Sequence, residues 1–387
     1  MDSGTSGPLT TEPAAGGDRM RLEDLQTPCL VLDRGVLERN LKRMSATVRR
    51  HGVSLRPHLK TAKSADVARM AVEGEAGGIT VSTLAEAEYF ADRGFGDILV
   101  AAALPPQKLD RAAAIAARGV VMTLITDDVA GAVAIANHRA SFRALIELDS
   151  GDRRAGVDAS SLALLEIGRA LQSKLAGVMT HAGHSYGCRT IQCIKDIAED
   201  ERRTVVTAAE RLREAGMRCE VVSVGSTPTI THADRLDGVT EARPGVYMFQ
   251  DLFQAEIGSC RREDIAITVL ASVIGREPDE NRFIVDAGAL ALSKDRSTQA
   301  TAHDARYGQV WDVDGRPSFG NCLVELAYQE HGVAVGADPL PFSELQLGAK
   351  VRIGPNHACI TAAAYDSYYV VDGGTEVVAV WDRVNGW

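Results

Sequence analysis

The chain has 387 residues, of which 45% are hydrophobic and 24% charged, and its formal net charge is −10. A chain of this length can bury a large core and predicts two domains, or one barrel with an addition. The acidic balance argues against nucleic acid or an anionic membrane as the main partner, although a local basic pocket for an anionic substrate stays possible. No apolar run approaches the ~20 residues that cross a bilayer, so we expect a soluble protein.

Cysteine usage and the N-terminal composition indicate the compartment. The seven cysteines form no C-x-x-C pair and no pattern typical of a disulfide framework. An odd number of cysteines without a signal peptide predicts reduced thiols and a cytoplasmic location. The first residues are rich in Gly, Ser, Thr, Pro and Ala and contain no apolar core segment, which predicts a flexible tail over residues 1–22.

From Pro28 onwards, short β-branched runs alternate with amphipathic stretches of helical period. The runs lie at 29–32, 53–57, 79–82, 98–102, 121–125, 144–148, 175–180, 221–224 and 245–247. This alternation predicts parallel strands joined by helices. Without the first run, eight strands remain, which is the number in a (β/α)8 barrel. We prefer the barrel to an open doubly wound sheet, partly because no G-x-G-x-x-G or Walker A sequence follows a strand.

After Ser259 the strand-like runs have few helices between them. They lie at 265–273, 283–285, 308–313, 350–353, 368–371 and 377–380. This succession of strand-like runs with few helices between them predicts an antiparallel β domain. The predicted organisation is therefore a tail over 1–22, a barrel over 23–257 and a C-terminal β domain over 258–387.

Lys60 follows the first barrel run and Pro57, which biases the chain toward extended geometry. The position predicts a lysine at the carboxyl end of a strand, where α/β folds place their chemistry. Desolvation or a cationic neighbour, such as Arg56 or Lys63, can remove the charge of a lysine held there. The neutral amine can then form a Schiff base with an aldehyde, whereas the alternative is an ordinary solvated lysine.

A His-x-Cys pair, His357 and Cys359, follows the run at 350–353. In an extended segment both side chains would share one face. Imidazole and thiolate are ligands that Zn²⁺ prefers. Two ligands are too few for a structural site but suit a catalytic one, in which water and substrate fill the other positions. A loop histidine beside a buried cysteine is the alternative.

Two other strand ends carry candidate binding groups. Gly225-Ser226-Thr227 offers hydroxyls and backbone N–H groups that can cradle a phosphate, and late barrel loops often do so, although such clusters are also ordinary turns. His181 can stack on an aromatic cofactor or act as an acid or base. Together with His184 it is also a candidate metal pair.

Two motifs resemble one known family. They are Arg56-Pro-His-Leu-Lys-Thr-x-Lys-Ser and Gly78-Ile-Thr-Val-Ser-Thr-Leu-Ala-Glu-Ala-Glu. They are similar to the fold-type III pyridoxal phosphate (PLP) enzymes of the D-serine dehydratase, D-threo-3-hydroxyaspartate dehydratase and D-threonine aldolase family. The similarity extends from about Thr27 to Trp387 and is closest to the dehydratases at 221–229, 235–241 and 329–332. It implies an alanine-racemase-like (β/α)8 barrel with a C-terminal antiparallel β domain, which the first residues of the chain, such as 29–32, often join.

The resemblance also implies roles for individual residues. Lys60 would carry PLP, and Arg154 would lie near its phenolic oxygen, with Arg153 as a competitor for that role. The implied PLP contacts are Lys60, Arg154, His181, Tyr186, Gly225, Ser226, Thr227, Gly245, Val246 and Tyr247. Asp286 and the segment 329–332 match the family without an assigned role.

The resemblance implies a metal site as well. His357 and Cys359 match the zinc ligands of D-serine dehydratase, whereas D-threonine aldolase has His-x-Asp. The hydroxyaspartate dehydratases do not clearly keep the histidine, so the need for a metal in that branch stays open. We expect Zn²⁺, with Mn²⁺, Co²⁺ or Mg²⁺ as alternatives.

The implied activity is β-elimination from a small β-hydroxy-D-amino acid, giving a 2-keto acid and ammonia. Lys60 would remove the α-proton, and a metal on His357 and Cys359 would bind the β-hydroxyl. D-serine, D-threonine and D-threo-3-hydroxyaspartate stay open as substrates, and a homodimer is expected. The alternatives are a D-threonine or 3-hydroxy-D-aspartate aldolase, an amino-acid racemase and a non-catalytic PLP-binding protein. Cys359 in place of aspartate argues against the aldolase, and the C-terminal domain argues against the carrier.

Overall fold

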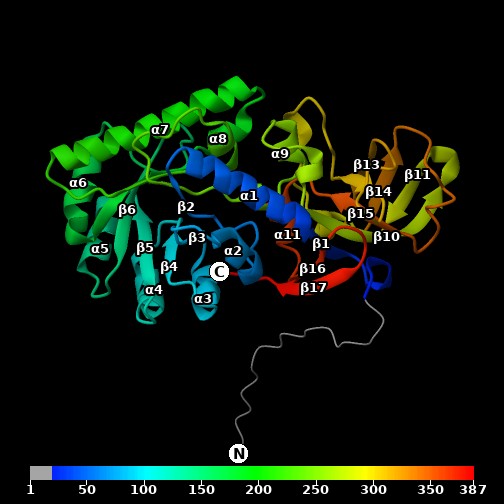
Figure 1. Ribbon diagram of the computed structural model, residues 1–387, viewed down its shortest axis with the longest axis horizontal. Coiled ribbons are helices and arrows are strands. Elements are labelled where there is room, and N and C mark those ends of the chain that lie inside the picture. Colours follow the sequence, from blue (N-terminus) through cyan, green and yellow to red (C-terminus); the bar gives the residue numbers. More distant parts are fainter. Residues whose placement is uncertain (1–19) are drawn as a thin grey trace, which may run out of the picture.

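The computed structural model describes residues 20–387, which form two sheets with helices around the first of them (Figure 1). Residues 1–19 of the predicted tail lie outside the described residues. Residues 20–22 are placed against the second sheet, because Arg21 pairs with Glu376 and Leu22 is fully buried.

The first sheet is parallel and has the strand order β2-β9-β8-β7-β6-β5-β4-β3. Its members are β2 (Ser54–Leu55), β3 (Ile79–Val81), β4 (Asp97–Val100), β5 (Val121–Thr126), β6 (Arg143–Leu148), β7 (Leu175–Thr180), β8 (Val221–Val224) and β9 (Glu241–Ala242). A parallel bridge between His58 and Thr80 joins the two ends of this order. The predicted eight-stranded barrel is therefore confirmed.

The eighth strand was predicted in the wrong place. It is β9, whereas residues Val246–Met248 form a 3-10 helix. Pro244 has no N–H to donate to a ladder, and Gly245 leaves the extended region with φ −127° and ψ −61°. The chain therefore turns at the point where the sequence pattern predicted a strand.

Helices cover the outside of the barrel (Figure 1). They are α1 (Arg34–Arg50), α2 (Ala65–Val72), α3 (Leu84–Asp92), α4 (Leu109–Ala116), α5 (Val129–Asn137), α6 (Leu162–Leu171), α7 (Ile191–Glu214) and α8 (Thr227–His232). Six of them follow a residue whose side chain accepts a hydrogen bond from a first-turn N–H, namely Asp33, Thr83, Asp128, Ser161, Thr190 and Ser226. These N-caps satisfy amides that have no intrahelical partner.

The second sheet has nine strands in the order β11-β14-β13-β12-β15-β10-β1-β16-β17. They are β1 (Cys29–Asp33), β10 (Ile267–Glu277), β11 (Arg282–Val285), β12 (Gln309–Trp311), β13 (Cys322–Ala327), β14 (Gly332–Gly336), β15 (Lys350–Gly354), β16 (Ser367–Val371) and β17 (Val377–Asp382). Because β11 also pairs with β10, part of this sheet closes into a second, antiparallel barrel. The strand β1 pairs with β10 and β16, so the first strand of the chain lies in this sheet.

The C-terminal segment holds the turn that follows Lys60. The Tyr368 hydroxyl donates to the carbonyl oxygen of Ala62 at 2.6 Å, and the amide of Val384 donates to that of Lys63 at 2.8 Å. Tyr368 is fully buried and meets Phe249 edge-on, with ring centroids 5.5 Å apart. The β domain therefore fixes the backbone on which Lys60 stands.

The prediction that all cysteines are reduced is wrong for one pair. Cys188 and Cys193 form a disulfide, with Cα atoms 5.7 Å apart. The turn between Tyr186 and the first residues of α7 brings these two positions within bonding range, which a C-x4-C spacing alone does not indicate. Within residues 20–387, no helix is long and apolar enough to cross a membrane.

Candidate active site

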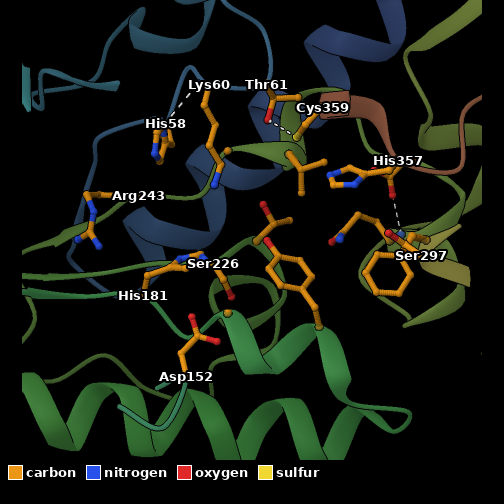
Figure 2. Close-up of a pocket in the computed structure, with 18 of the residues that line it drawn as sticks. His58, Lys60, Thr61, Asp152, His181, Ser226, Arg243, Ser297, His357 and Cys359 are labelled. Atoms are coloured by element: carbon orange, nitrogen blue, oxygen red, sulfur yellow. Dashed lines mark hydrogen bonds between the residues drawn. The ribbon is translucent and has the colours of Figure 1, made fainter. Parts of the chain in front are cut away.

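A cavity of about 570 Å³ lies where the carboxyl ends of the barrel strands face the β domain (Figure 2). It brings together most of the predicted site residues: Lys60, Arg154, His181, Tyr186, Ser226, Thr227, Gly245, Val246, His357 and Cys359. Gly225 lines an adjoining cavity of about 320 Å³, together with Lys60 and Arg154. Tyr247 lines neither cavity. Its ring is buried, and its backbone N–H donates to Thr227 Oγ1 at 3.1 Å.

Lys60 stands on a tight turn between β2 and α2. The amide of Leu59 donates to the carbonyl of Thr80 at 2.8 Å, and the amide of Lys63 donates to that of Leu59 at 2.7 Å. The turn projects the side chain into the cavity, between His58 on one side and Thr61, Cys359 and His357 on the other (Figure 2).

The expected cationic neighbours of Lys60 are engaged elsewhere. The Arg56 guanidinium pairs with Asp97 at 3.0 Å and with Glu241 at 2.8 Å, and the Lys63 ammonium lies 3.3 Å from Glu86. Both cations are thus neutralised by carboxylates. Their expected effect on Lys60 is not supported by the structure.

Two histidines beside Lys60 are held neutral. Burial lowers the pKa of His181 to about 3, and the charge of Lys60 adds to this effect. Burial, followed by the charge of Lys60, also lowers the pKa of His58 well below its usual value. The Nδ1–H of His181 donates to the carbonyl of Gly225 at 2.5 Å, which fixes the ring at the cavity wall. A neutral, fixed imidazole suits stacking on an aromatic ring better than proton transfer.

The predicted phosphate cradle is formed by two turns. At Gly225, with φ +158°, a Cβ atom would lie 2.8 Å from the backbone N of Arg243. At Gly245, it would lie 2.9 Å from the carbonyl oxygen of His58. Both positions therefore require glycine. Thr227 and Val246 begin helical turns, whose first N–H groups have no intrahelical partner. This arrangement fits a phosphate group.

Arg243 is a cavity residue that the sequence reasoning did not identify. Its buried guanidinium donates to the carbonyl of Thr180 and to Ser223 Oγ. Ser223 Oγ in turn donates to Glu241 Oε1 at 2.6 Å. The only signal in the sequence was its place directly after a strand, since its hydrogen-bond partners lie about twenty and sixty residues away.

Arg154 lines both cavities, as predicted for a residue near the cofactor. Its guanidinium lies 3.9 Å from Glu147 and 4.0 Å from Asp152. Arg153 has φ +55° and lines neither cavity. The structure therefore favours Arg154 over Arg153 for this position.

His357 and Cys359 face the same cavity, but the predicted extended geometry is wrong. His357 has extended backbone, and Cys359 lies in the first turn of α11 (Ala358–Ala362). The carboxylate of Asp251 accepts from the amide of Ala358 at 2.9 Å, which caps the helix from another segment. The pair meets across a helix start, which the sequence spacing did not indicate.

The chemistry of this pair fits a metal site. The Nδ1–H of His357 donates to Asp295 Oδ2 at 2.5 Å, so Nε2 is left for a ligand. Burial lowers the pKa of His357, but hydrogen bonds to Asp295 and Cys359 outweigh it and raise the value to about 11. Burial raises the pKa of Cys359, but His357 outweighs it, so the thiol pKa is lowered. Within residues 20–387 no three His, Cys, Asp or Glu side chains form a metal-binding group, so a metal here would have two protein ligands.

The rest of this wall comes from two segments that the sequence reasoning missed. The helix α9 (Leu252–Glu256) is bound to the segment between β15 and His357, since the amides of Leu252 and Phe253 donate to the carbonyl oxygens of Pro355 and Asn356 at 3.1 and 3.2 Å. It brings Asp251, Phe253 and Gln254 to the cavity.

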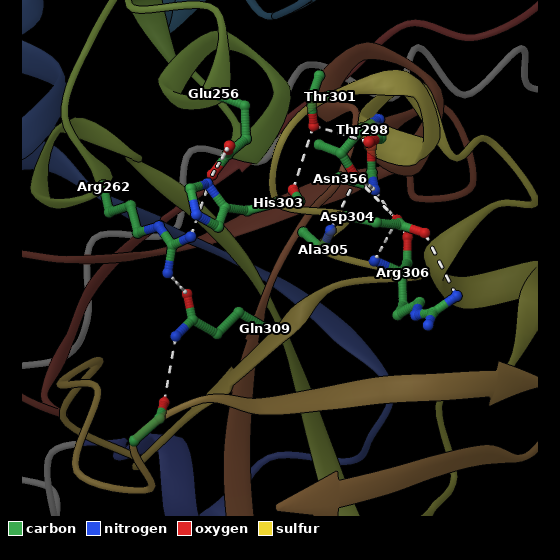
Figure 3. Close-up of polar contacts among 11 residues, drawn as sticks. Glu256, Arg262, Thr298, Thr301, His303, Asp304, Ala305, Arg306, Gln309 and Asn356 are labelled. Carbon is green, nitrogen blue, oxygen red and sulfur yellow. Dashed lines mark hydrogen bonds and ion pairs between the residues drawn. The ribbon is translucent and has the colours of Figure 1, made fainter. Parts of the chain in front are cut away.

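A loop that carries Asp295 and Ser297 completes the wall. Asn356 anchors it, because its Nδ2 donates to Thr298 Oγ1 and to the carbonyl of Arg306, both at 2.7 Å. Figure 3 shows Thr298 in turn beside Asp304, whose carboxylate contacts Arg306. Asn356 thus fixes the loop that orients its neighbour His357.

Comparison with known proteins gives the family. An alanine racemase N-terminal domain model matches residues 32–252, and a serine dehydratase domain model matches residues 266–371. D-threo-3-hydroxyaspartate dehydratase of Delftia sp. (strain HT23) is 46% identical over 94% of this chain and 98% of its own. D-serine dehydratase of Dictyostelium discoideum is 30% identical over 95% and 98%.

Solved structures of related proteins support the same family. The D-threo-3-hydroxyaspartate dehydratase of Delftia sp. HT23 superposes with a TM-score of 0.90 at 45% identity, over 95% of this chain and 100% of that one. Two variants of a D-threo-3-hydroxyaspartate dehydratase are also similar, one with a histidine and one with a cysteine replaced by alanine, and the cysteine variant is described as metal-free. The two substituted positions are two residues apart, as His357 and Cys359 are. The histidine, whose retention in that branch was left open, is therefore present in this relative.

The chain belongs to the alanine racemase N-terminal domain family, in the branch of D-amino-acid dehydratases and aldolases. This family is PLP-dependent. The resemblance seen in the sequence is thereby confirmed.

Proposed function

We propose that this protein is a PLP- and metal-dependent dehydratase, which converts β-hydroxy-D-amino acids to 2-keto acids and ammonia. The observation that carries the proposal is the single cavity in which Lys60 faces His357 and Cys359. Similarity to a dehydratase over nearly the whole chain supports it.

The cofactors would be held by groups already described. The turns at Gly225–Thr227 and Gly245–Val246 would bind the phosphate of PLP. His181 would stack on its ring, and Arg154 would lie near its phenolic oxygen. Tyr186 would contact the cofactor from the side. His357 and Cys359 would hold the metal. Bound PLP supplies an electrophilic aldehyde and an electron sink, and a divalent metal supplies a Lewis acid for the β-hydroxyl.

The protein's own groups then have distinct tasks. Lys60 Nζ, on its fixed turn, binds the cofactor at rest and takes the proton from the substrate's α-carbon once released. His357 and Cys359 fix the side on which the β-hydroxyl lies. Asp295 orients His357 through its Nδ1–H.

We propose Zn²⁺ as the metal, because an imidazole and a thiolate are the ligands that it prefers. Mn²⁺, Co²⁺ and Mg²⁺ are the alternatives. The metal-free cysteine variant of the related dehydratase supports a metal at this pair without identifying the ion.

Three other activities are alternatives. A retro-aldol aldolase shares the cofactor, and aldolases occur among the relatives, such as a D-threonine aldolase of Arthrobacter sp. at 29% identity. The thiol of Cys359, in place of a carboxylate, favours the dehydratase. A racemase or a non-catalytic PLP-binding protein would have no use for the metal pair.

Substrate, assembly and location are further parts of the proposal. We propose that the protein binds a small D-amino acid and that neither nucleic acid nor a membrane is a partner. We propose a homodimer, as the resemblance to the family implies. Sedimentation analysis would test it. A cytoplasmic location stays a prediction that cell fractionation would test, and the Cys188–Cys193 disulfide does not favour it.

Metal removal tests the proposed function. With a β-hydroxy-D-amino acid as substrate, we expect keto-acid formation to fall at least about tenfold on chelation and to return with Zn²⁺. Cys359→Ala should bind less than a full equivalent of metal and should not be rescued. Cys260→Ala, a matched change outside the cavity, should behave as wild type. Turnover that survives chelation, in a protein shown to be metal-free, would contradict the role of the metal.

A further inference from the structure

Gln254 is a polar cavity residue for which the proposed reaction has no task. It lies in the first turn of α9, lines the main cavity and is only 2% exposed. Its Oε1 atom is enclosed and has no hydrogen-bond partner, and Nε2 forms no hydrogen bond within residues 20–387. A buried carboxamide without partners costs free energy, so it calls for an explanation such as a ligand.

The position of Gln254 defines what it could meet. Its helix is bound to the segment that carries His357, through the backbone hydrogen bonds of Leu252 and Phe253. The two turns proposed to bind phosphate, at Ser226 and Gly245, line the same cavity as Lys60 and His357. A substrate whose α-carbon faces Lys60 and whose β-hydroxyl faces His357 therefore directs its next substituent toward the wall formed by α9 and Ser297.

The hydrogen bonds on this wall favour a substituent that accepts hydrogen bonds. Its two carboxylates are both engaged: Asp251 accepts from the amides of Gln254 and Ala358 at 2.8 and 2.9 Å, and Asp295 accepts from His357 at 2.5 Å. The Ser297 hydroxyl already donates to Asp295 at 2.7 Å. The carboxamide is thus the free donor, and rotation about its last bond can present both N–H groups to an acceptor.

We infer that Gln254 is a specificity-determining residue that binds the substituent beyond the β-carbon and selects a β-carboxylate. A 3-hydroxyaspartate supplies this group, whereas D-serine and D-threonine leave the amide unpaired. This inference rests on the proposed function and deepens it, since it chooses among substrates that the sequence left open. A site built to hydrogen-bond a polar group discriminates strongly against the analogue that lacks it.

Charge reversal on an isosteric frame gives the sharpest test. Gln254→Glu keeps the shape but opposes a carboxylate, so we expect kcat/KM for D-threo-3-hydroxyaspartate to fall about 100-fold or more, mostly through KM, and that for D-serine to change less than about threefold. Gln254→Met removes the donors without adding charge and should lower the hydroxyaspartate value about tenfold. Gln107→Glu is the matched control, because it makes the same change at an exposed position and should alter neither value.

A binding measurement separates this inference from the proposed function. D-aspartate and D-alanine lack the β-hydroxyl, and their affinities can be titrated from the absorbance of the bound cofactor without turnover. Wild type should bind D-aspartate more tightly than D-alanine, and Gln254→Glu should abolish that preference. If Gln254→Glu abolishes the preference for D-aspartate but no keto acid forms from D-threo-3-hydroxyaspartate or D-serine, the dehydratase proposal fails and the inference stands. An equal fall in kcat/KM for D-threo-3-hydroxyaspartate and D-serine would overturn the inference. An unchanged preference for D-aspartate in both Gln254 variants would also overturn it.

Discussion

At the scale of single residues, the environment of His181 has a consequence for acid stability. Its ring is neutral because burial lowers its pKa from 6.5 to about 3. Above pH 6.5 the imidazole is neutral in both the folded and the unfolded chain, so it contributes no pH dependence. Between about pH 6.5 and 3 only the unfolded chain binds the proton, so the free energy of unfolding falls as the pH falls.

We therefore predict that His181→Asn flattens the decline in stability between about pH 6.5 and 3. Asparagine can still donate to the carbonyl of Gly225, which limits other effects. Urea unfolding of the apoprotein across this range, monitored by circular dichroism, measures the slope. His331→Asn, an exposed control in the β13–β14 turn, should keep the wild-type slope. If the pH dependence of the free energy of unfolding in His181→Asn has the same slope as in wild type, this histidine is not held neutral by the fold.

The residues that could be identified from the sequence are those whose chemical role is indicated by the residue types within one short segment. Lys60 and the pair His357 and Cys359 belong to this group. Arg243 and Gln254 do not, because their significance depends on partners, or on the lack of partners, in the folded chain. An unpaired carboxamide looks like any other glutamine until the structure shows that nothing near it donates or accepts.

At the scale of elements, α7 supports the cofactor site from behind through one carboxylate. Glu201 is 2% exposed, and its Oε1 accepts from the amides of Ala182 and Gly225 at 3.1 and 3.0 Å. These two amides belong to the turns that carry His181 and Ser226. A single oxygen therefore holds two loops of the site at a fixed separation.

Glu201→Ala should leave both amides unpaired, which costs about 1–3 kcal/mol for each group, and should raise the dissociation constant of PLP about tenfold or more. Glu201→Gln retains the accepting oxygen and should bind PLP within about threefold of wild type. Fluorescence titration of the apoenzyme with PLP checks both values, and Glu210→Gln on the exposed face of α7 is the control. A PLP affinity in Glu201→Ala equal to that of wild type would contradict this role.

Element types were predicted well where the hydrophobic period was long and poorly where chain geometry overrode it. The strands β3 to β8 were placed correctly because they are short apolar runs between amphipathic helices. The strands β13 and β14 were missed, since glycines at 332 and 336 and the polar turn between the strands interrupt the pattern. The helix α11 was predicted as extended, because its cap is Asp251 from a distant segment.

At the scale of the whole molecule, the candidate active site exists because the two sheets meet. The barrel supplies Lys60 and the turns at Ser226 and Gly245, and the segment after β15 supplies His357 and Cys359. Hydrogen bonds from the side chains of Tyr368 and Arg383 to the carbonyl oxygen of Ala62 join them. Sequence patterns predicted both parts, but these hydrogen bonds connect residues about 300 positions apart, which no local pattern can specify.

We propose that this cavity performs β-elimination. Product analysis with D-threo-3-hydroxyaspartate, using the PLP- and Zn²⁺-loaded protein, is the decisive test. We expect a 2-keto acid and ammonia in equal amounts, with no glycine. Glycine and an aldehyde acid in equal amounts would show carbon–carbon cleavage instead and would contradict the assignment of the His357 and Cys359 pair to dehydration.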